Sequence, residues 1–293
     1  MMHVMNRSEQ PRYIIAVSGG IDSVVLLDKL SAEGVQLIVA HVDHGIRPDS
    51  PEDAVFVGEL ARQYGHKFVS ISLSLGPSAS EDTARQARYE WLETQRDEYG
   101  AEAIVTAHHE DDVLETIFIN LTRNTGWRGI CSLRETAHIK RPLLTMSKAG
   151  IIAYAIEHDL KWREDSTNDS MQYLRNRIRH AVVPKLTAEQ RGRLVELYQN
   201  QLVLRQEIEE LTHQLVGQWS GEEGIDRYQL IMADEAVSWE LLRDWLGTSL
   251  ERQRFRDLLL FAKVARSGAK WSLSEGHFVA ATKRRLIVLP SRD

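Results

Sequence analysis

The stretch at residues 14–27, which reads IIAVSGGIDSVVLL, constrains the fold most strongly. Its first four residues are apolar and mostly β-branched, which is typical of a buried parallel strand. Gly19 and Gly20 interrupt this run, and a second apolar run at residues 24–27 predicts a helix. A strand that turns through two glycines into a helix N-terminus leaves backbone N–H groups free for an anion. The stretch therefore predicts a phosphate-binding turn, although a plain glycine turn would share part of the pattern.

The side chains of this turn add to the prediction. Ser18 and Ser23 supply hydroxyl donors, and the turn has no lysine and no GxxxxGK[ST] pattern, so it is not a Walker A loop. Asp22 would repel a phosphate unless a divalent cation such as Mg²⁺ lay between them, so Asp22 is a candidate metal ligand. The predicted nucleotide-binding residues of the turn are Ser18, Gly19, Gly20, Ile21, Asp22 and Ser23.

The rest of the chain alternates apolar runs with helical patterns, which predicts an α/β fold with a doubly wound, mostly parallel sheet. Further strands are expected at 35–42, 67–73 and 101–106, and helices at 53–65, 81–99 and 147–159. A run at 189–219 that contains few helix-breaking residues predicts a long linking helix. The expected domains are 1–185, a helical linker at 186–220, and a small α+β domain at 221–293 with helices at 236–246 and 251–265 and a hairpin at 271–289.

Composition limits the class of protein. Cys131 is the single cysteine among 293 residues, so neither an intramolecular disulfide nor a cysteine-rich zinc site is expected. No apolar run is long enough to span a bilayer, and the N-terminus has no signal-peptide core. A cytoplasmic protein without membrane contact is therefore expected.

Charge is unevenly distributed although the net charge is only −6. Residues 171–205 carry 7 Lys and Arg against 2 Asp and Glu, and residues 252–293 carry 10 against 3. Two basic blocks in an acidic chain suggest localised contacts with a nucleic-acid backbone, and two solvated basic faces would explain them equally well. The first block contains the closely spaced Arg175, Arg177 and Arg179.

Acidic residues gather after the strand expected at 101–106. Asp112 and Glu115 are three residues apart on a predicted helix and so project from one side. Acids in a first helical turn can simply compensate the helix dipole, which explains Glu110 and Asp111 better than Glu115. At the mouth of a nucleotide site, the pair would form a cage for an ammonium group.

Two further positions are candidates near the nucleotide. Arg85 and Arg88 lie one turn apart on the helix expected at 81–99, and either could steady charge on a phosphate. His41 ends the strand expected at 35–42, where ligands sit in a doubly wound sheet. More commonly, a histidine at such a position makes hydrogen bonds within the protein and contacts no ligand.

Several motifs together resemble one family, the tRNA(Ile)-lysidine synthetases, which carry an N-type ATP pyrophosphatase loop. They occur in the family's order over residues 12–185, and the chain resembles a short form of the family. The motifs are SGGIDS, HVDHGIR (41–47), ARQARY (84–89), TAHHEDDVLET (106–116), RPLL (141–144), and EDSTND with YLRNRIR (164–179).

The resemblance implies an adenine nucleotide alpha-hydrolase-like fold and a ligase reaction. ATP would adenylate cytidine 34 in the CAU anticodon of tRNA(Ile), and free L-lysine would then displace AMP from C2 to give lysidine. The implied catalytic residues are Asp22, Arg88, Asp112 and Glu115, with Asp112 and Glu115 on the lysine and His41 among the ATP contacts. Arg175, Arg177 and Arg179 would grip the tRNA, Mg²⁺ would bridge through Asp22, and the family suggests a homodimer. The resemblance favours Arg88 over Arg85, and the general base stays open.

Other activities share the pyrophosphatase loop. Thiolation of tRNA by a persulfide relay needs a cysteine pair, and this chain has only Cys131. Synthetases of GMP, NAD, asparagine or argininosuccinate have no use for the YLRNRIR run or the C-terminal basic block. A non-catalytic tRNA-recognition module is disfavoured by the intact loop and the acid pair.

Overall fold

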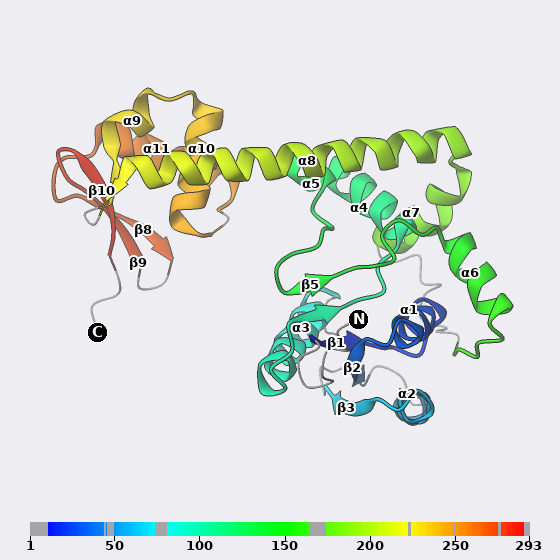
Figure 1. Ribbon diagram of the computed structural model, residues 1–293. Helices are drawn as coiled ribbons and strands as arrows, with labels where there is room; N and C mark the ends of the chain where they lie inside the picture. Colours follow the sequence, from blue (N-terminus) through cyan, green and yellow to red (C-terminus); the bar gives the residue numbers. More distant parts are fainter. Residues whose placement is uncertain are drawn as a thin grey trace, which may run out of the picture. The chain divides into compact units, whose positions relative to one another are not determined.

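The computed structural model describes residues 11–43, 45, 50–73, 81–163, 174–221, 224–248, 250–274 and 277–289 (Figure 1). The chain divides into two compact units, residues 1–201 and 202–293. This division falls inside the expected linker at 186–220. The predicted motif residues 44, 46–47 and 164–173, and the predicted hairpin turn at 275–276, lie outside the described residues.

Unit 1 is built on a five-stranded parallel sheet in the order β3-β2-β1-β4-β5. Ile14 of β1 lies opposite Ile38 of β2 and Ile104 of β4, so β1 is central. The chain winds outward from β1 in both directions, which creates a switch point between β1 and β4. The strands are β1 Arg12–Ala16, β2 Gln36–Asp43, β3 Lys67–Ser72, β4 Ala103–Val105 and β5 Ile139–Lys140.

Helices cover both faces of this sheet, as the α/β prediction requires. Apolar side chains of α1, α2 and α6 pack with Ile15 and Val39 on one face, and Leu92 of α3 packs with Ile14 and Ile38 on the other. The doubly wound fold is thus confirmed. The helices of the sheet region are α1 Ile21–Ala32, α2 Ser50–Gln63, α3 Glu81–Glu98, α4 Glu110–Thr122, α5 Trp127–Ile130 and α6 Lys148–Glu157.

Turns at the amino-terminal edge of the sheet use glycines. Gly34, Gly65 and Gly100 have φ of +75°, +72° and +58°, and each follows a helix and precedes a strand. Such left-handed residues close helix C-termini at little steric cost when they are glycine.

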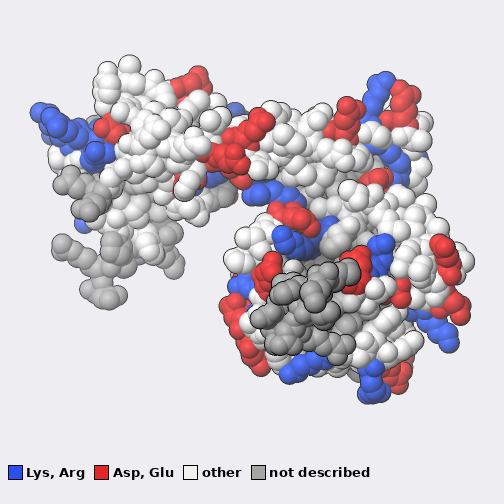
Figure 2. All heavy atoms as spheres, viewed as in Figure 1, with Lys and Arg blue, Asp and Glu red and all other residues white. Residues whose placement is uncertain are grey.

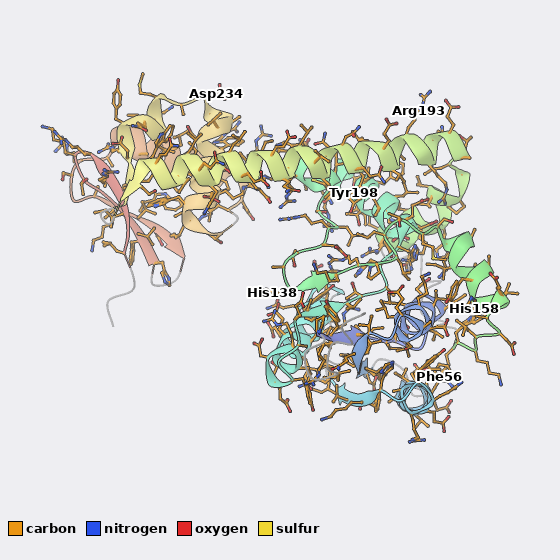
Figure 3. All side chains as sticks on the ribbon, viewed as in Figure 1. Phe56, His138, His158, Arg193, Tyr198 and Asp234 are labelled. Carbon is orange, nitrogen blue, oxygen red and sulfur yellow. The ribbon has the colours of Figure 1, made fainter. Side chains whose placement is uncertain are left out.

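Helix α7 (Leu174–Ala181) packs on α4 through Ile178 and Leu114, and the short helix η2 (Val183–Lys185) follows. Helix α8 (Ala188–Trp219) comes next, close to the predicted 189–219. Within unit 1, the Tyr198 hydroxyl of α8 donates a hydrogen bond of 2.7 Å to the carbonyl of Leu133 (Figure 3). Among the described residues, no helix combines the length and apolarity needed to cross a bilayer.

Among the described residues, unit 2 contains an antiparallel sheet in the order β6-β7-β10-β9-β8, the helices α9, α10 and α11, and the end of α8. Phe255 and Leu258 of α11 pack with Val279 and Leu286 of the sheet. Sequence reasoning expected α10, α11 and the last three strands but missed α9, β6 and β7, because runs of two to six residues are too short to show periodicity. The elements are β6 Ser220–Gly221, β7 Gly224–Asp226, α9 Arg227–Met232, α10 Glu235–Leu246, α11 Arg252–Val264, β8 Lys270–Ser274, β9 His277–Ala281 and β10 Arg285–Leu289.

Charged side chains differ between the two units on the face shown in Figure 2. Over unit 1, Lys and Arg alternate with Asp and Glu, whereas Lys and Arg gather at one edge of unit 2.

Candidate active site

The turn after β1 is shaped to receive an anion. Gly19 has φ of +93°, a conformation that favours glycine, and the chain enters α1 directly afterwards. The N-cap residue of α1 is Gly20, which has no side chain to satisfy the free N–H groups of the first turn. Ser23 holds the turn together, since its hydroxyl donates to the Gly20 carbonyl at 2.8 Å and accepts from the Ser18 N–H at 3.2 Å. The helix N-terminus is therefore open to a phosphate.

A cavity of about 330 Å³ opens at the carboxyl ends of β1, β2 and β4. Small and apolar residues of the strands form one wall of this cavity, and polar residues of the loops and helices around it form the rest. This combination suits a nucleotide, whose base is flat and apolar on its faces and whose phosphates need donors. The lining residues are Ala16, Val17, Ser18, Asp22, Ser23, Ala40, Val42, Arg88, Thr106, Ala107, His108 and Asp112.

Asp22 projects from the first turn of α1 into this cavity. Its Oδ1 lies 2.5 Å from the Nζ of Lys148, the first residue of α6, and 3.7 Å from Nε2 of His109. The Asp22 side chain is 32% exposed, so it remains accessible to a ligand. Sequence reasoning did not single out Lys148. The usable signal was Ser147, a helix N-cap just after the predicted strand exit at RPLL, which would place the next side chain at the same sheet edge.

The wall of the cavity also carries positive charge. Arg88 of α3 borders the cavity, whereas Arg85 is not among the lining residues. Both guanidinium groups lie over the ring of Tyr89, at 5.3 and 5.2 Å from its centroid. Burial lowers the pKa of Arg88, and its Nε is buried with no hydrogen-bond partner among the described atoms. An arginine keeps its charge in such a place, so Arg88 is available to an anionic ligand.

His108 faces the same cavity and was not predicted as a site residue. Burial, together with the nearby Arg141, Arg85 and Arg88, lowers its pKa to about 3, against an opposing effect of Asp112. The imidazole is therefore neutral near pH 7. Its Nδ1 lies 2.9 Å from the Thr106 hydroxyl, which fixes the orientation of the ring.

The acid pair of α4 lies beside the cavity, and two arginines of α7 cover it. Glu115 is 1% exposed, and its two oxygens accept hydrogen bonds from Arg179 at 2.6 and 3.1 Å and from Arg175 at 2.9 Å. Asp112 Oδ1 lies 3.4 Å from Arg179 and 3.6 Å from Arg175, and its Oδ2 accepts from the His109 N–H. Burial alone would raise the pKa of Asp112, but His109, His108 and Arg175 lower it overall. Nearby positive charge and the His109 N–H therefore favour the carboxylate form of Asp112.

The match to a family model covers residues 1–186 and is described as a PP-loop domain. The chain belongs to the PP-loop domain family. Membership implies the use of ATP, because the PP-loop is an ATP-binding element, and it accords with the open helix N-terminus at Gly20.

Three curated relatives of this PP-loop protein carry the name tRNA(Ile)-lysidine synthase, which confirms the resemblance drawn from the motifs. The relative from Solibacter usitatus is 40% identical and is matched over 63% of this chain and 43% of its own length. Relatives from Exiguobacterium sibiricum and Thermus thermophilus are 39% and 38% identical over 59% of this chain and over 43% and 35% of their own lengths. The chain therefore spans less than half the length of these relatives.

A solved structure shares the fold at low identity. The U34-tRNA thiolase NcsA from Methanococcus maripaludis, with its [4Fe-4S] cluster, matches with a TM-score of 0.55 at 16% identity, over 68% of this chain and 75% of that one. At this identity the likeness extends to the fold alone.

The PP-loop protein brings most of the predicted site residues together. Ser18, Asp22, Ser23, Arg88 and Asp112 line one cavity, and Glu115 lies behind Asp112. His41 does not line it: its Nδ1 lies 2.9 Å from the Val17 carbonyl, and its neighbours Ala40 and Val42 line the cavity instead. Alternation along β2 explains this, since successive side chains point to opposite faces of the sheet.

The three arginines predicted to bind tRNA separate into two kinds. Arg175 and Arg179 face the acids of α4, whereas Arg177 points away from them and is exposed. Helical periodicity accounts for this, because residues four apart share a face and the residue between them does not.

Proposed function

We propose that this chain is a tRNA(Ile)-lysidine synthetase, which joins L-lysine to C2 of cytidine 34 in the CAU anticodon of tRNA(Ile) and converts ATP to AMP and pyrophosphate. One observation carries the proposal. The phosphate-binding turn, through Ser18, Asp22 and Ser23, and the acidic helix, through Asp112, line the same cavity. A departing pyrophosphate and an incoming amine can therefore be held at one adenylated base.

In the first step, O2 of the cytidine attacks the α-phosphorus of ATP and the bond to the β-phosphate breaks. The N-terminus of α1 and the two serine hydroxyls stabilise the negative charge that develops on the leaving group. Arg88 adds a positive charge in the cavity wall, and Lys148 adds one beside Asp22.

The residues present also fit Mg²⁺. Proteins hold Mg²⁺ through one or two carboxylates together with substrate phosphates, and Asp22 offers one partly exposed carboxylate at the turn. Bound there, Mg²⁺ would neutralise phosphate charge. Among the described residues, no group of three or more His, Cys, Asp or Glu side chains forms a metal site without a substrate.

In the second step, the ε-amine of lysine attacks C2 and AMP departs. Asp112 and Glu115 are the groups that we assign to the ammonium of the substrate. An anionic site selects a cationic amino acid, and neutral His108 in the cavity wall adds no competing positive charge. Only the neutral form of the attacking amine is nucleophilic, so a proton must leave before attack.

Binding of tRNA is assigned to the two basic blocks, with exposed Arg177 as a phosphate contact in the first. The substrate implies a cytoplasmic reaction, and the resemblance to the family implies a homodimer, which light scattering would detect. Affinity for tRNA should fall steeply with salt if several phosphates are bound.

The test is mass analysis of nucleosides from tRNA(Ile) with a CAU anticodon after incubation with protein, ATP, Mg²⁺ and lysine. We expect one cytidine to gain the mass of lysine less water, and the gain to need each component. Asp22→Asn should remove the product. A cytidine that gains sulfur, or ATP consumption independent of tRNA, would refute the proposal in favour of thiolation or a small-molecule synthetase.

A further inference from the structure

The acids that we assign to the amine are already paired within the protein. Both oxygens of Glu115 and one oxygen of Asp112 face the guanidinium groups of Arg175 and Arg179, at 2.6 to 3.6 Å. A guanidinium and an ammonium compete for the same carboxylate oxygens. An amine therefore has to replace at least one of these arginines before it can occupy the pair.

The two arginines are also more exposed than the acids with which they pair. The Glu115 side chain is 1% exposed and that of Asp112 10%, whereas those of Arg175 and Arg179 are 22% and 34% exposed. Glu115 is therefore covered by these cationic side chains, whereas Asp112 also lines the cavity.

The helix that carries these arginines does not depend on them alone. Ile178, on α7, is buried against Leu114 of α4. The two guanidinium groups could therefore swing outward on their flexible stems while α7 stays docked through its apolar contact.

We infer that Arg175 and Arg179 form a plug that closes the amine site until a polyanion draws them away, so that RNA binding opens the site to lysine. This inference rests on the proposed function. Phosphate oxygens accept bidentate hydrogen bonds from arginine as carboxylates do, so an RNA backbone gives the arginines an alternative partner. Exposed Arg177 on the same helix adds attraction for the same backbone. Without RNA, displacing the arginines costs their ion pairs with Glu115 and Asp112, and amine binding is weakened accordingly.

Coupling of this kind is reciprocal. If RNA raises the affinity for lysine by some factor, lysine must raise the affinity for RNA by the same factor. The plug also prevents lysine from occupying the site before the cytidine is in place, so the order of substrate entry follows from the ion pairs.

The experiment measures lysine binding by calorimetry, without ATP, at fixed salt. Arg179→Gln keeps donors for Glu115 but removes the charge, and we expect it to bind lysine about tenfold more tightly than the natural chain when no RNA is present. Arg62→Gln is the matched control, because Arg62 is an exposed residue of α2 that lies outside both basic blocks. It should bind lysine as the natural chain does. Hexanoate, which lacks an amine, should gain nothing from Arg179→Gln.

A second measurement needs no variant and so does not depend on folding of Arg179→Gln. A CAU tRNA(Ile) transcript should tighten lysine binding by the natural chain about tenfold, and lysine should tighten transcript binding equally. Equal lysine affinity with and without transcript would overturn the plug. If lysidine forms but this coupling is absent, the plug fails and the proposed function stands. If the coupling is present but no lysidine forms, the proposed function fails and the plug remains a gate for amines.

Discussion

The ammonium of Lys148 lies 2.5 Å from the carboxylate of Asp22, although 126 positions separate the two residues. The contact joins the first turn of α1 to the first residue of α6 at the mouth of the cavity. Without a nucleotide, the lysine neutralises Asp22. We expect the same ammonium to act on the phosphates of ATP bound at the turn.

We therefore expect Lys148→Ala to lower the rate of pyrophosphate release about 100-fold, since one charged donor to the leaving group is lost. The Mg²⁺ concentration for half-maximal rate should not rise, because the Lys148 ammonium no longer competes with Mg²⁺ for the Asp22 carboxylate. Lys161→Ala, at an exposed position, is the control. A rate for Lys148→Ala within twofold of the natural protein would rule out the role.

The turn itself can be tested with two glycines of similar backbone strain. Gly19 and Gly34 have φ of +93° and +75°, so alanine at either should lower the free energy of unfolding by about 1–2 kcal/mol. Only Gly19→Ala should also weaken ATP binding, because only Gly19 belongs to the phosphate turn. Chemical denaturation and ATP titration of both variants separate the two effects. Equal ATP affinity in the two variants would contradict the assignment of the turn.

Acid should destabilise the protein through His108. The pKa of His108 is about 3 in the folded chain and 6.5 in the unfolded chain. Below pH 6.5 the imidazole is therefore protonated in the unfolded state while it stays neutral in the folded state. The free energy of unfolding should therefore fall between pH 6.5 and 3, by up to about 1.4 kcal/mol per pH unit from this group. His108→Asn, which keeps a partner for Thr106, should show a shallower dependence in denaturation curves at several pH values. His138→Asn, at an exposed position, should retain the natural slope (Figure 3).

Arg227 joins separate segments of unit 2. Arg227 donates to the carbonyls of Ala262 at 2.5 Å, Ala265 at 2.7 Å and Thr282 at 2.9 Å, which ties the end of α11 to the turn before β10. Arg227→Met should lower the free energy of unfolding by about 2–4 kcal/mol, since three charged hydrogen bonds are lost. Arg252→Met removes a contact of Arg252 with the Trp239 ring and should cost under about 1 kcal/mol. Similar losses in thermal unfolding of the two variants would show that the carbonyl contacts contribute little.

Local pattern accounts for what could be predicted. The β-branched run of β1, the glycine pair and the acids of α4 are each visible within one short stretch, and parallel strands necessarily bring their carboxyl ends to one edge. Lys148 could not be paired with Asp22 in this way, because no periodicity links them. The basic run of α7 predicts an anionic partner, but sequence does not say whether that partner is a phosphate or, as for Arg179, Glu115 of the same chain.

The glycines at the two edges of the parallel sheet answer to different demands. Gly34, Gly65 and Gly100 reverse the chain at the amino-terminal edge, far along each strand from the cavity, and any residue that tolerates a left-handed backbone would serve there. Gly19, at the opposite edge, must turn the chain and also keep its backbone accessible to a ligand. Asparagine should therefore be tolerated in place of the glycines at the amino-terminal edge but should impair the site in place of Gly19. Substitutions at the two edges can thus accumulate independently as such proteins diverge.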